Sequence, residues 1–353
     1  MSDAANETKP LGWAVIGTGW MTRTHMVRAI NKASGSKVVA VLSSSQERAE
    51  EFAKEFDIPN AYSSLDDLVA DPAVDVVFVS STNELHKPQT LAAASAGKHV
   101  LCEKPLSTNI QDGLDIVEAC RESGVVLGTN HYRRLKTTIQ TVRRLIAEGA
   151  IGRPILARAT STGWLSEEQQ TWRLTSVEAG GGVVLDIGVH DADLLRYLLD
   201  DEVDEVSAAT GHSGLLKGEL EDYAVTTLRF RNGTIATSTV SFCTPGSIGA
   251  IEVMGSEGTI FARDLLADKL GGEIYLRRGG LDLEKVDIGS EEEHYAEAVH
   301  QFNEAVRGNG APAVTGEDGV QSLAVAIAAL RSAERGTVVK LSEVLTESAL
   351  VAS

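Results

Sequence analysis

The first third of the chain alternates short apolar runs with segments of helical periodicity, and this alternation restricts its fold more than any other feature. Residues with apolar spacings of three and four predict helices at about 21–33, 46–56, 85–96 and 109–123. The apolar runs predict strands at 12–16, 37–42, 74–79, 98–101 and 125–128. Because the helices connect successive strands, we expect βαβ units around a parallel sheet.

From about residue 152 the pattern changes to alternating apolar and polar residues, which is typical of half-buried antiparallel strands. Helices predicted at 189–199, 291–307 and 319–335 would cover this second sheet. The predicted strands are 155–162, 203–210, 223–230, 234–242, 250–254, 259–263 and 273–277. The chain is therefore expected to be an α/β protein in which a parallel sheet precedes an open, mostly antiparallel one.

The length of 353 residues favours two domains, because single hydrophobic cores stop growing at roughly 250–300 residues. We expect a flexible tail at 1–10, a nucleotide-binding domain at 11–130, and an α+β domain for substrate binding and oligomerisation at 131–353. A sheet with one uncovered face invites self-association, so a homodimer or homotetramer is expected.

Composition excludes several classes of partner. The net charge of −18 argues against nucleic acid, which requires clustered Lys and Arg. No segment approaches the about 20 consecutive apolar residues that span a bilayer, and the polar first ten residues lack a signal-peptide core. A soluble, cytoplasmic protein that binds no membrane is therefore expected.

A turn containing two glycines, Gly17-Thr18-Gly19, follows the first predicted strand and precedes the first predicted helix. Glycine allows the backbone to approach a ligand closely, and a helix N-terminus offers free N–H groups to a pyrophosphate. Thr22 replaces the third glycine of the full dinucleotide fingerprint, which leaves an ordinary βα turn as the alternative. We predict that this turn binds a dinucleotide.

The residues after the second predicted strand bear on the choice of cofactor. An acidic residue there would accept hydrogen bonds from the adenine ribose of NAD, but the chain has Ser43, Ser44 and Ser45, followed by Arg48. Hydroxyls and a guanidinium suit the additional 2′-phosphate of NADP. Glu47 could serve NAD instead. NADP is the predicted cofactor, with NAD as the alternative.

The segment Glu103-Lys104-Pro105 directly follows the predicted strand 98–101, at the sheet edge where ligands of open parallel sheets bind. Hydride transfer to a carbonyl needs a proton donor near the oxygen, on which negative charge develops, and Lys104 is a candidate for this role. Pro105 fixes the turn, and Glu103 could hold Lys104 by an ion pair. A solvated surface lysine is the alternative.

Asp186 and His190 are four residues apart, so they share one face of a helix, and they follow a glycine-rich run at 179–182. His190 could donate a proton while Asp186 orients it or binds a substrate hydroxyl. A structural histidine in a capped helix is the alternative. With Asp191 and Asp193 the pair could also ligate a metal, but no HExxH or paired-cysteine spacing accompanies them, so no metal is predicted.

Taken together, these motifs resemble those of the Gfo/Idh/MocA oxidoreductase family, over about residues 11 to 341. The resemblance also includes the runs 81–86, 127–131, 172–174 and 178–193. It implies an N-terminal Rossmann domain and a C-terminal domain whose open, mostly antiparallel sheet carries the substrate site and often the oligomer interface.

The resemblance further implies roles for individual residues. Lys104 and His190 would be the catalytic pair, and Asp186 would shape the substrate site. The predicted cofactor contacts are Gly17, Thr18, Gly19, Trp20, Met21, Ser43, Ser44, Arg48, Ser80, Ser81, Thr82, Asn83, His86, Glu103, Lys104, Asn130, Trp172 and Arg173. The predicted substrate contacts are Lys104, Tyr132, Arg133, Asp186, His190 and Asp193.

Two hypotheses for function follow. The first is an NADP-dependent oxidoreductase that reduces a carbonyl group of a sugar or polyol. Members of the family act on inositols, aldoses, sugar acids and anhydro-sugars, so an NAD-dependent inositol or aldose dehydrogenase is a variant of this hypothesis. The second is a dinucleotide-sensing regulator without catalysis. Relatives of that kind tend to lack the lysine or the histidine, and this chain keeps both Lys104 and His190.

Overall fold

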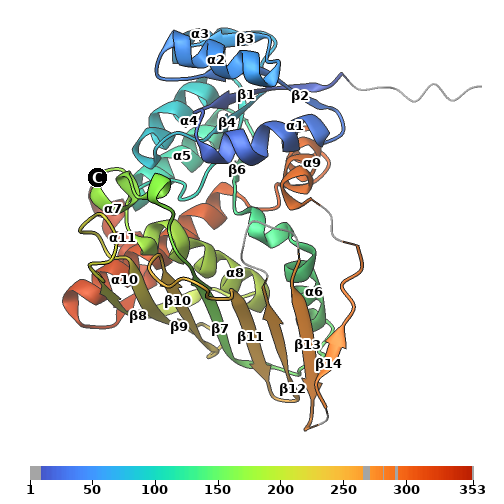
Figure 1. Ribbon diagram of the computed structural model, residues 1–353, viewed down its shortest axis with the longest axis vertical. Coiled ribbons are helices and arrows are strands. Elements are labelled where there is room, and N and C mark those ends of the chain that lie inside the picture. Colours follow the sequence, from blue (N-terminus) through green and yellow to red (C-terminus); the bar gives the residue numbers. More distant parts are fainter. Residues whose placement is uncertain (1–8, 265–270, 281, 291–292, 352–353) are drawn as a thin grey trace, which may run out of the picture. The chain divides into compact units, whose positions relative to one another are not determined.

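The computed structural model describes residues 9–264, 271–280, 282–290 and 293–351. The chain divides into two compact units, each discontinuous in sequence (Figure 1). The first comprises Met1–Glu103, Leu114–Asn130 and Tyr295–Gly316, and the second comprises Lys104–Gly113, His131–His294 and Glu317–Ser353. The linear division of the chain at residue 130 stays a prediction, and residues 1–8 of the expected tail lie outside the described residues.

The first unit contains a six-stranded parallel sheet in the order β3-β2-β1-β4-β5-β6, as the alternating pattern predicted. Strands β2 and β3 lie on one side of β1, and β4, β5 and β6 lie on the other. Ligands of such sheets bind at this point, where the strand order reverses. The strands are β1 (Leu11–Ile16), β2 (Ser36–Leu42), β3 (Asn60–Tyr62), β4 (Val76–Val79), β5 (His99–Cys102) and β6 (Leu127–Thr129). The short strand β3 was not predicted.

The helices of this unit connect successive strands along the chain. They are a π-helical turn η1 (Thr22–Met26) continuing into α1 (Val27–Lys32), then α2 (Gln46–Phe56), α3 (Leu65–Ala70), α4 (His86–Ser95) and α5 (Ile110–Glu122). Ser45 caps α2, since its side chain accepts a hydrogen bond from the N–H of Arg48. This cap fixes the start of α2 directly after the residues that were predicted to select the cofactor.

A distant helix, α9 (His294–Val306), completes the core of the first unit. The fully buried Trp13 of β1 donates from Nε1 to Asn303 Oδ1 at 3.1 Å, and its ring contacts the edge of Phe302 with centroids 5.5 Å apart. A buried indole N–H needs such a partner. The sequence predicted a helix at 291–307, but not that this helix packs in the first unit. Residues 291 and 292 lie outside the described part of the chain.

The second unit contains a nine-stranded sheet in the order β14-β13-β12-β11-β7-β10-β9-β8-β15. Only the neighbours β7 and β10 are parallel, so the sheet is mostly antiparallel, as predicted. The strands are β7 (Pro154–Thr162), β8 (Val203–Gly211), β9 (Tyr223–Phe230), β10 (Ile235–Ser241), β11 (Ala250–Gly255), β12 (Gly258–Arg263), β13 (Glu273–Arg278), β14 (Glu284–Val286) and β15 (Val339–Lys340).

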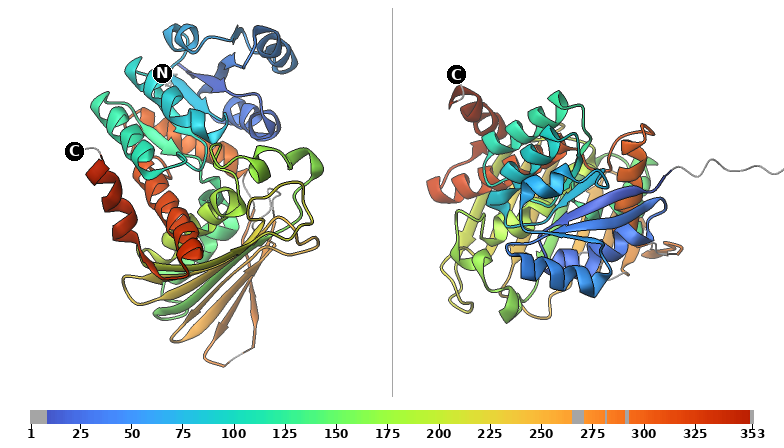
Figure 2. Two further views of the ribbon diagram at one scale, coloured as in Figure 1. Left: turned by 90° about the vertical axis from the view of Figure 1, so that its left-hand side faces the viewer. Right: turned by 90° about the horizontal axis from the view of Figure 1, so that it is seen from above.

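Helices cover one face of the nine-stranded sheet, while Figure 2 shows none of the described helices on the other. The helices of this unit are α6 (Thr137–Ala147), α7 (Trp172–Thr175), α8 (Val189–Leu199), α10 (Gly316–Arg335) and α11 (Leu341–Val351). Strand β9 alternates accordingly: Leu228 and Phe230 are buried, whereas Tyr223 and Val225 are 43% and 48% exposed. Within the described residues, no helix is both long enough and apolar enough to cross a membrane.

The turn after β1 requires glycine at one position and not at the other. Gly17 has φ of 96°, and a Cβ added there would lie 2.4 Å from the carbonyl oxygen of Ser80, at the end of β4. A Cβ added to Gly19 would meet no described atom within 4 Å. Gly17 therefore lets β1 and β4 end close together, and Gly19 leaves open space beside the turn.

We expect Gly17→Ala to destabilise the first unit by about 1–3 kcal/mol, because alanine is strained at positive φ and its methyl group clashes with Ser80. Thermal unfolding without added cofactor measures this loss. Gly19→Ala is the matched control and should unfold near the wild-type temperature. Equal unfolding temperatures for the two variants would contradict the assignment.

Candidate active site

In the first unit, the predicted cofactor contacts lie at the carboxyl ends of five strands. Because these strands are parallel, their carboxyl ends share one edge of the sheet. Residues 17–21 follow β1, Ser43 and Ser44 follow β2, residues 80–83 follow β4, Glu103 follows β5 and Asn130 follows β6. Arg48 lies in the first turn of α2, and the buried His86 begins α4.

The glycine turn in the first unit fits a pyrophosphate. The helical run begins at Trp20, so its first N–H groups lie directly after Gly19, where the backbone has open space. Thr18 Oγ1 lies 3.3 Å from Ser43 Oγ, which ties this turn to the end of β2. The buried Thr22, at the position of the third glycine, continues the helix without interrupting it. The residues present are those that a dinucleotide requires.

Glu103 and Asn130 contact each other at the ends of β5 and β6. Asn130 Nδ2 donates to Glu103 Oε1 at 2.6 Å, and both side chains are buried. That Glu103 holds Lys104 by an ion pair stays a prediction. Lys104 forms an ion pair with Asp186, in the second unit and 82 positions along the chain, and the sequence did not predict this partner.

The second unit brings Lys104, Asp186 and Arg173 into one charged cluster. Lys104 Nζ donates to Asp186 Oδ1 at 2.6 Å and to the backbone carbonyl of Asp186 at 2.8 Å. Arg173 Nε contacts Asp186 Oδ2 at 3.3 Å. The side chains of Lys104 and Asp186 are only 12% and 11% exposed. Two cations therefore share one carboxylate in a largely desolvated place.

The charge state of Asp186 follows from these contacts. Burial alone would raise the pKa of this carboxyl, but the charges and hydrogen bonds of Lys104 and Arg173 outweigh burial and lower the pKa to about 2. Asp186 is therefore an anion at every physiological pH. The carboxylate that orients the Lys104 ammonium therefore stays charged between pH 4 and pH 8.

His190 lies four residues after Asp186, at the junction of a π-helical turn η5 (Val184–Gly188) and α8. Its ring is 3% exposed and meets the rings of His131 and Tyr132 edge-on, with centroids 5.4 and 5.7 Å away. Burial, together with the charges of Arg133 and Lys104, lowers the pKa of His190 well below its usual value. His190 is therefore a neutral imidazole near pH 7.

A second buried acid, Asp191, holds the first turn of α8 against the sheet. Its Oδ1 accepts from Ser161 of β7 at 2.5 Å and its Oδ2 from Ser238 of β10 at 2.7 Å. Arg133, a predicted substrate contact, lies 3.5 Å from the same Ser161 hydroxyl through Nη1. Burial raises the pKa of Asp191 against the opposing effects of these partners. This network fixes the backbone next to His190.

Asp193, another predicted substrate contact, is 1% exposed and both its oxygens accept hydrogen bonds from Arg134, at 2.7 and 2.8 Å. Ser322 of α10 also donates to it at 3.3 Å. Its role toward substrate stays a prediction, and its contacts are those of a structural ion pair. Arg134 also bonds to Asp318. This contact was not predicted, because partners 184 positions apart share no local pattern.

Trp172 and Arg173 lie in α7 of the second unit, apart in sequence from the strand ends of the first. The Arg173 guanidinium lies over the Trp172 ring, 4.6 Å from its centroid, and so is held on one side by the indole and on the other by Asp186. Their contact with a cofactor stays a prediction. No group of three or more His, Cys, Asp or Glu side chains suited to a metal occurs among the described residues.

Comparison with known proteins agrees with this architecture. Residues 11–131 match the oxidoreductase family with an NAD-binding Rossmann fold, and residues 139–261 match the Gfo/Idh/MocA C-terminal domain. The chain is 43% identical over 328 residues to 1,5-anhydro-D-fructose reductase of Ensifer adhaerens, covering 92% of this chain and 96% of that protein. The chain therefore belongs to the Gfo/Idh/MocA family of NAD(P)-dependent oxidoreductases.

Other relatives differ in substrate. Myo-inositol 2-dehydrogenase of Thermotoga maritima is 32% identical over 345 residues, covering 94% of this chain and 98% of that protein. A crystal structure of aldose-aldose oxidoreductase from Caulobacter crescentus complexed with glycerol superposes with a TM-score of 0.86 at 26% identity, covering 94% of this chain and all of that one. These comparisons therefore identify the family but not the particular sugar substrate.

We expect Asp193→Asn to lower the free energy of unfolding by about 3 kcal/mol, since it leaves the buried Arg134 guanidinium short of a counter-charge. Urea unfolding measures the change. Glu148→Gln, which breaks the exposed i,i+4 pair with Arg144, is the control and should cost less than about 0.5 kcal/mol. A loss at Asp193 no larger than that at Glu148 would show that the pair is not structural.

Proposed function

We propose that this protein is an NADP-dependent sugar reductase that converts 1,5-anhydro-D-fructose to 1,5-anhydro-D-mannitol, with Lys104 and His190 as the catalytic residues. The observation that carries the chemistry is the buried Lys104–Asp186 pair, with His190 four residues further along the same helical segment. The similarity to 1,5-anhydro-D-fructose reductase over nearly the whole chain supports the choice of substrate.

The side chains divide the chemistry between them. A bound reduced nicotinamide would supply the hydride. Negative charge then builds on the substrate oxygen, and the Lys104 ammonium, aimed by two contacts with Asp186, would stabilise it. His190 would donate the proton that completes the alcohol. Asp186 would act as a positioning residue for Lys104, and Tyr132 and Arg133 are proposed to contact substrate hydroxyls.

Lys104→Ala should lower kcat by about 10²–10⁴-fold, because it removes the cation that faces the developing oxyanion. Loss of NADPH absorbance with 1,5-anhydro-D-fructose measures kcat, and fluorescence titration tests whether NADPH still binds. Lys217→Ala, at a lysine whose side chain is 74% exposed, is the control and should keep wild-type rates. Unchanged turnover of Lys104→Ala would refute the proposed chemistry.

The preference for NADP is proposed from the end of β2 and the start of α2. Ser43 replaces the acidic residue that would bind the adenine ribose of NAD, and Ser44 and Arg48 are exposed beside it. An exposed guanidinium at a helix N-terminus suits a 2′-phosphate. Glu47 occupies the same helical turn and is the group that would favour NAD.

Arg48→Ala should raise the KM for NADPH about ten- to a hundred-fold while leaving the KM for NADH nearly unchanged, since a charge-assisted hydrogen bond is worth about 1.5–3 kcal/mol. Initial rates with the two cofactors measure the ratio. Glu47→Gln is the companion variant: a loss of NADH binding there, with no effect of Arg48→Ala on NADPH, would assign NAD as the cofactor.

The substrate alternatives are an inositol or an aldose dehydrogenase, for which the 32% identity with myo-inositol 2-dehydrogenase is the supporting observation. A panel of inositols, aldoses and anhydro-sugars, assayed in both directions, separates them by kcat/KM. Tight cofactor binding with no turnover across the panel would favour the regulator hypothesis.

We also propose a homodimer or homotetramer, formed through the uncovered face of the nine-stranded sheet that exposes Tyr223 and Val225. Light scattering tests the oligomeric state.

A further inference from the structure

His131, directly before the 3₁₀ turn η3 (Tyr132–Leu135), is a buried imidazole with no part in the chemistry described above. It is 1% exposed, and neither of its ring nitrogens has a hydrogen-bond partner among the described residues. The same is true of Nδ1 of His190. The two rings are neighbours, with centroids 5.4 Å apart and planes at 83°.

Three unpartnered nitrogens in two adjacent buried rings are costly. Each buried polar atom without a partner destabilises the fold, and an apolar ring would fill the same space without that cost. A catalytic histidine also usually has its second nitrogen fixed by a carboxylate or a carbonyl oxygen. Within the described part of the chain, Nδ1 of His190 has neither. Its neighbour His131 is a group able to serve it through an intermediary.

We propose that His131 and Nδ1 of His190 form a hydroxyl-binding subsite, in which one O–H group bridges the two imidazoles and lets His131 supply protons to His190. The O–H group belongs either to an internal water molecule or to a hydroxyl of the sugar. The role of this subsite in turnover rests on the proposed function. The binding of an O–H group by the subsite does not.

The subsite explains how a neutral imidazole can act as an acid. As Nε2 of His190 gives its proton to the carbonyl oxygen, the bridging O–H gives a proton to Nδ1, and an N–H of His131 returns one to the bridging oxygen. The other nitrogen of His131 is also buried, so the proton that it takes reaches it from solvent through a second internal O–H group. The net change is one hydride and one proton added to the carbonyl, and both imidazoles end neutral.

The charged groups around the two rings agree with this scheme. Lys104 and Arg133 face His190, and their charges add to burial in keeping it neutral. Burial lowers the pKa of His131 to about 4; Asp193 opposes this shift, and Arg134, Lys104 and Arg196 add to it. Since burial and the neighbouring cations lower the pKa of both rings below the usual value of histidine, the relay itself should not titrate between pH 6 and 8.

The test is His131→Phe, which keeps a ring of similar shape and removes both nitrogens, compared with His131→Asn, which keeps a donor and an acceptor. We expect His131→Phe to lower kcat at least about tenfold without loss of NADPH binding or of thermal stability, and His131→Asn to recover part of the rate. If the bridge is water, KM stays constant and the solvent deuterium isotope effect on kcat changes. If it is a substrate hydroxyl, the KM for the sugar rises in His131→Phe. For the deoxy-sugar that lacks this hydroxyl, His131→Phe and the wild type then have the same kcat and KM.

NMR of isotope-labelled histidine in the NADPH complex without sugar gives a readout independent of turnover. A shift of the His190 Nδ1 resonance in His131→Phe supports the water-filled subsite even if no sugar is reduced, in which case only the proposed function fails. An unmoved resonance with a raised KM supports the substrate hydroxyl. Two outcomes overturn the proposal. One is an unmoved resonance with kcat, KM and the isotope effect all within twofold of wild type. The other is an unmoved resonance with no sugar turned over at all.

Discussion

The ion pair between Lys104 and Asp186 is the interaction on which the proposed chemistry depends. Burying two charges is expensive, and the cost is offset only where geometry is good and the remaining hydrogen-bonding capacity is used. Here Lys104 contacts both the carboxylate and the backbone carbonyl of Asp186, and Arg173 takes the second carboxylate oxygen. The result is an ammonium group held in one orientation, next to a histidine that burial and the charges of Arg133 and Lys104 keep neutral.

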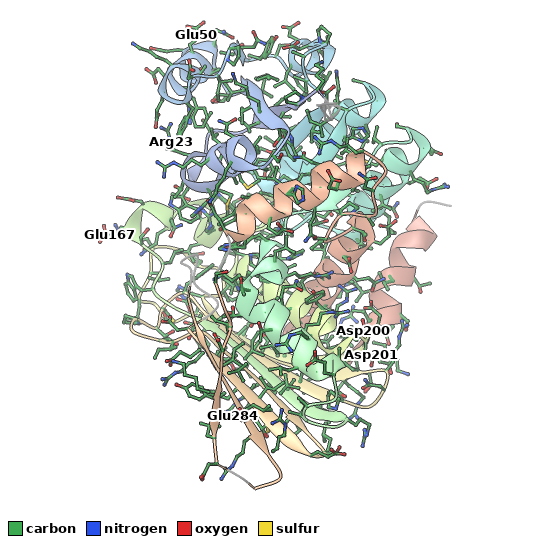
Figure 3. The ribbon with its side chains drawn as sticks, turned by 90° about the vertical axis from the view of Figure 1, so that its right-hand side faces the viewer. Arg23, Glu50, Glu167, Asp200, Asp201 and Glu284 are labelled. Atoms are coloured by element: carbon green, nitrogen blue, oxygen red, sulfur yellow. The ribbon has the colours of Figure 1, made fainter. Side chains whose placement is uncertain are left out.

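Helix α8 shows how this arrangement is maintained. Every residue of the helix except Tyr197 is buried, although it carries His190, Asp191, Asp193 and Arg196. A helix that is buried all round is normally apolar, so each of these groups needs a dedicated partner. Asp191 bonds to the sheet, Asp193 to Arg134, and Arg196 to Glu202 and Ser322. Figure 3 marks Asp200 and Asp201, which follow the last residue of the helix; Asp200 is exposed and pairs with Arg143.

Residues near one another in sequence were the predictable part of the site. The strand-turn-helix at Gly17, the acid and lysine after β5, and the i,i+4 pair of Asp186 and His190 each follow from a local pattern. The sequence did not reveal that Lys104 pairs with Asp186, because that contact joins segments 82 positions apart. His131 was missed for the same reason: a lone histidine has no pattern until its neighbours are known.

The sequence by itself determined the class of fold, since apolar periodicity depends only on neighbours along the chain, and a parallel sheet must expose its strand ends at one edge. It also determined which residues occupy those ends. The tertiary structure alone decided which charges are buried together, how Trp13 obtains Asn303 as its partner, and which nitrogens of His131 and His190 find no partner among the described residues. Burial and pairing set protonation states, and both are properties of atoms that meet in space from distant parts of the chain.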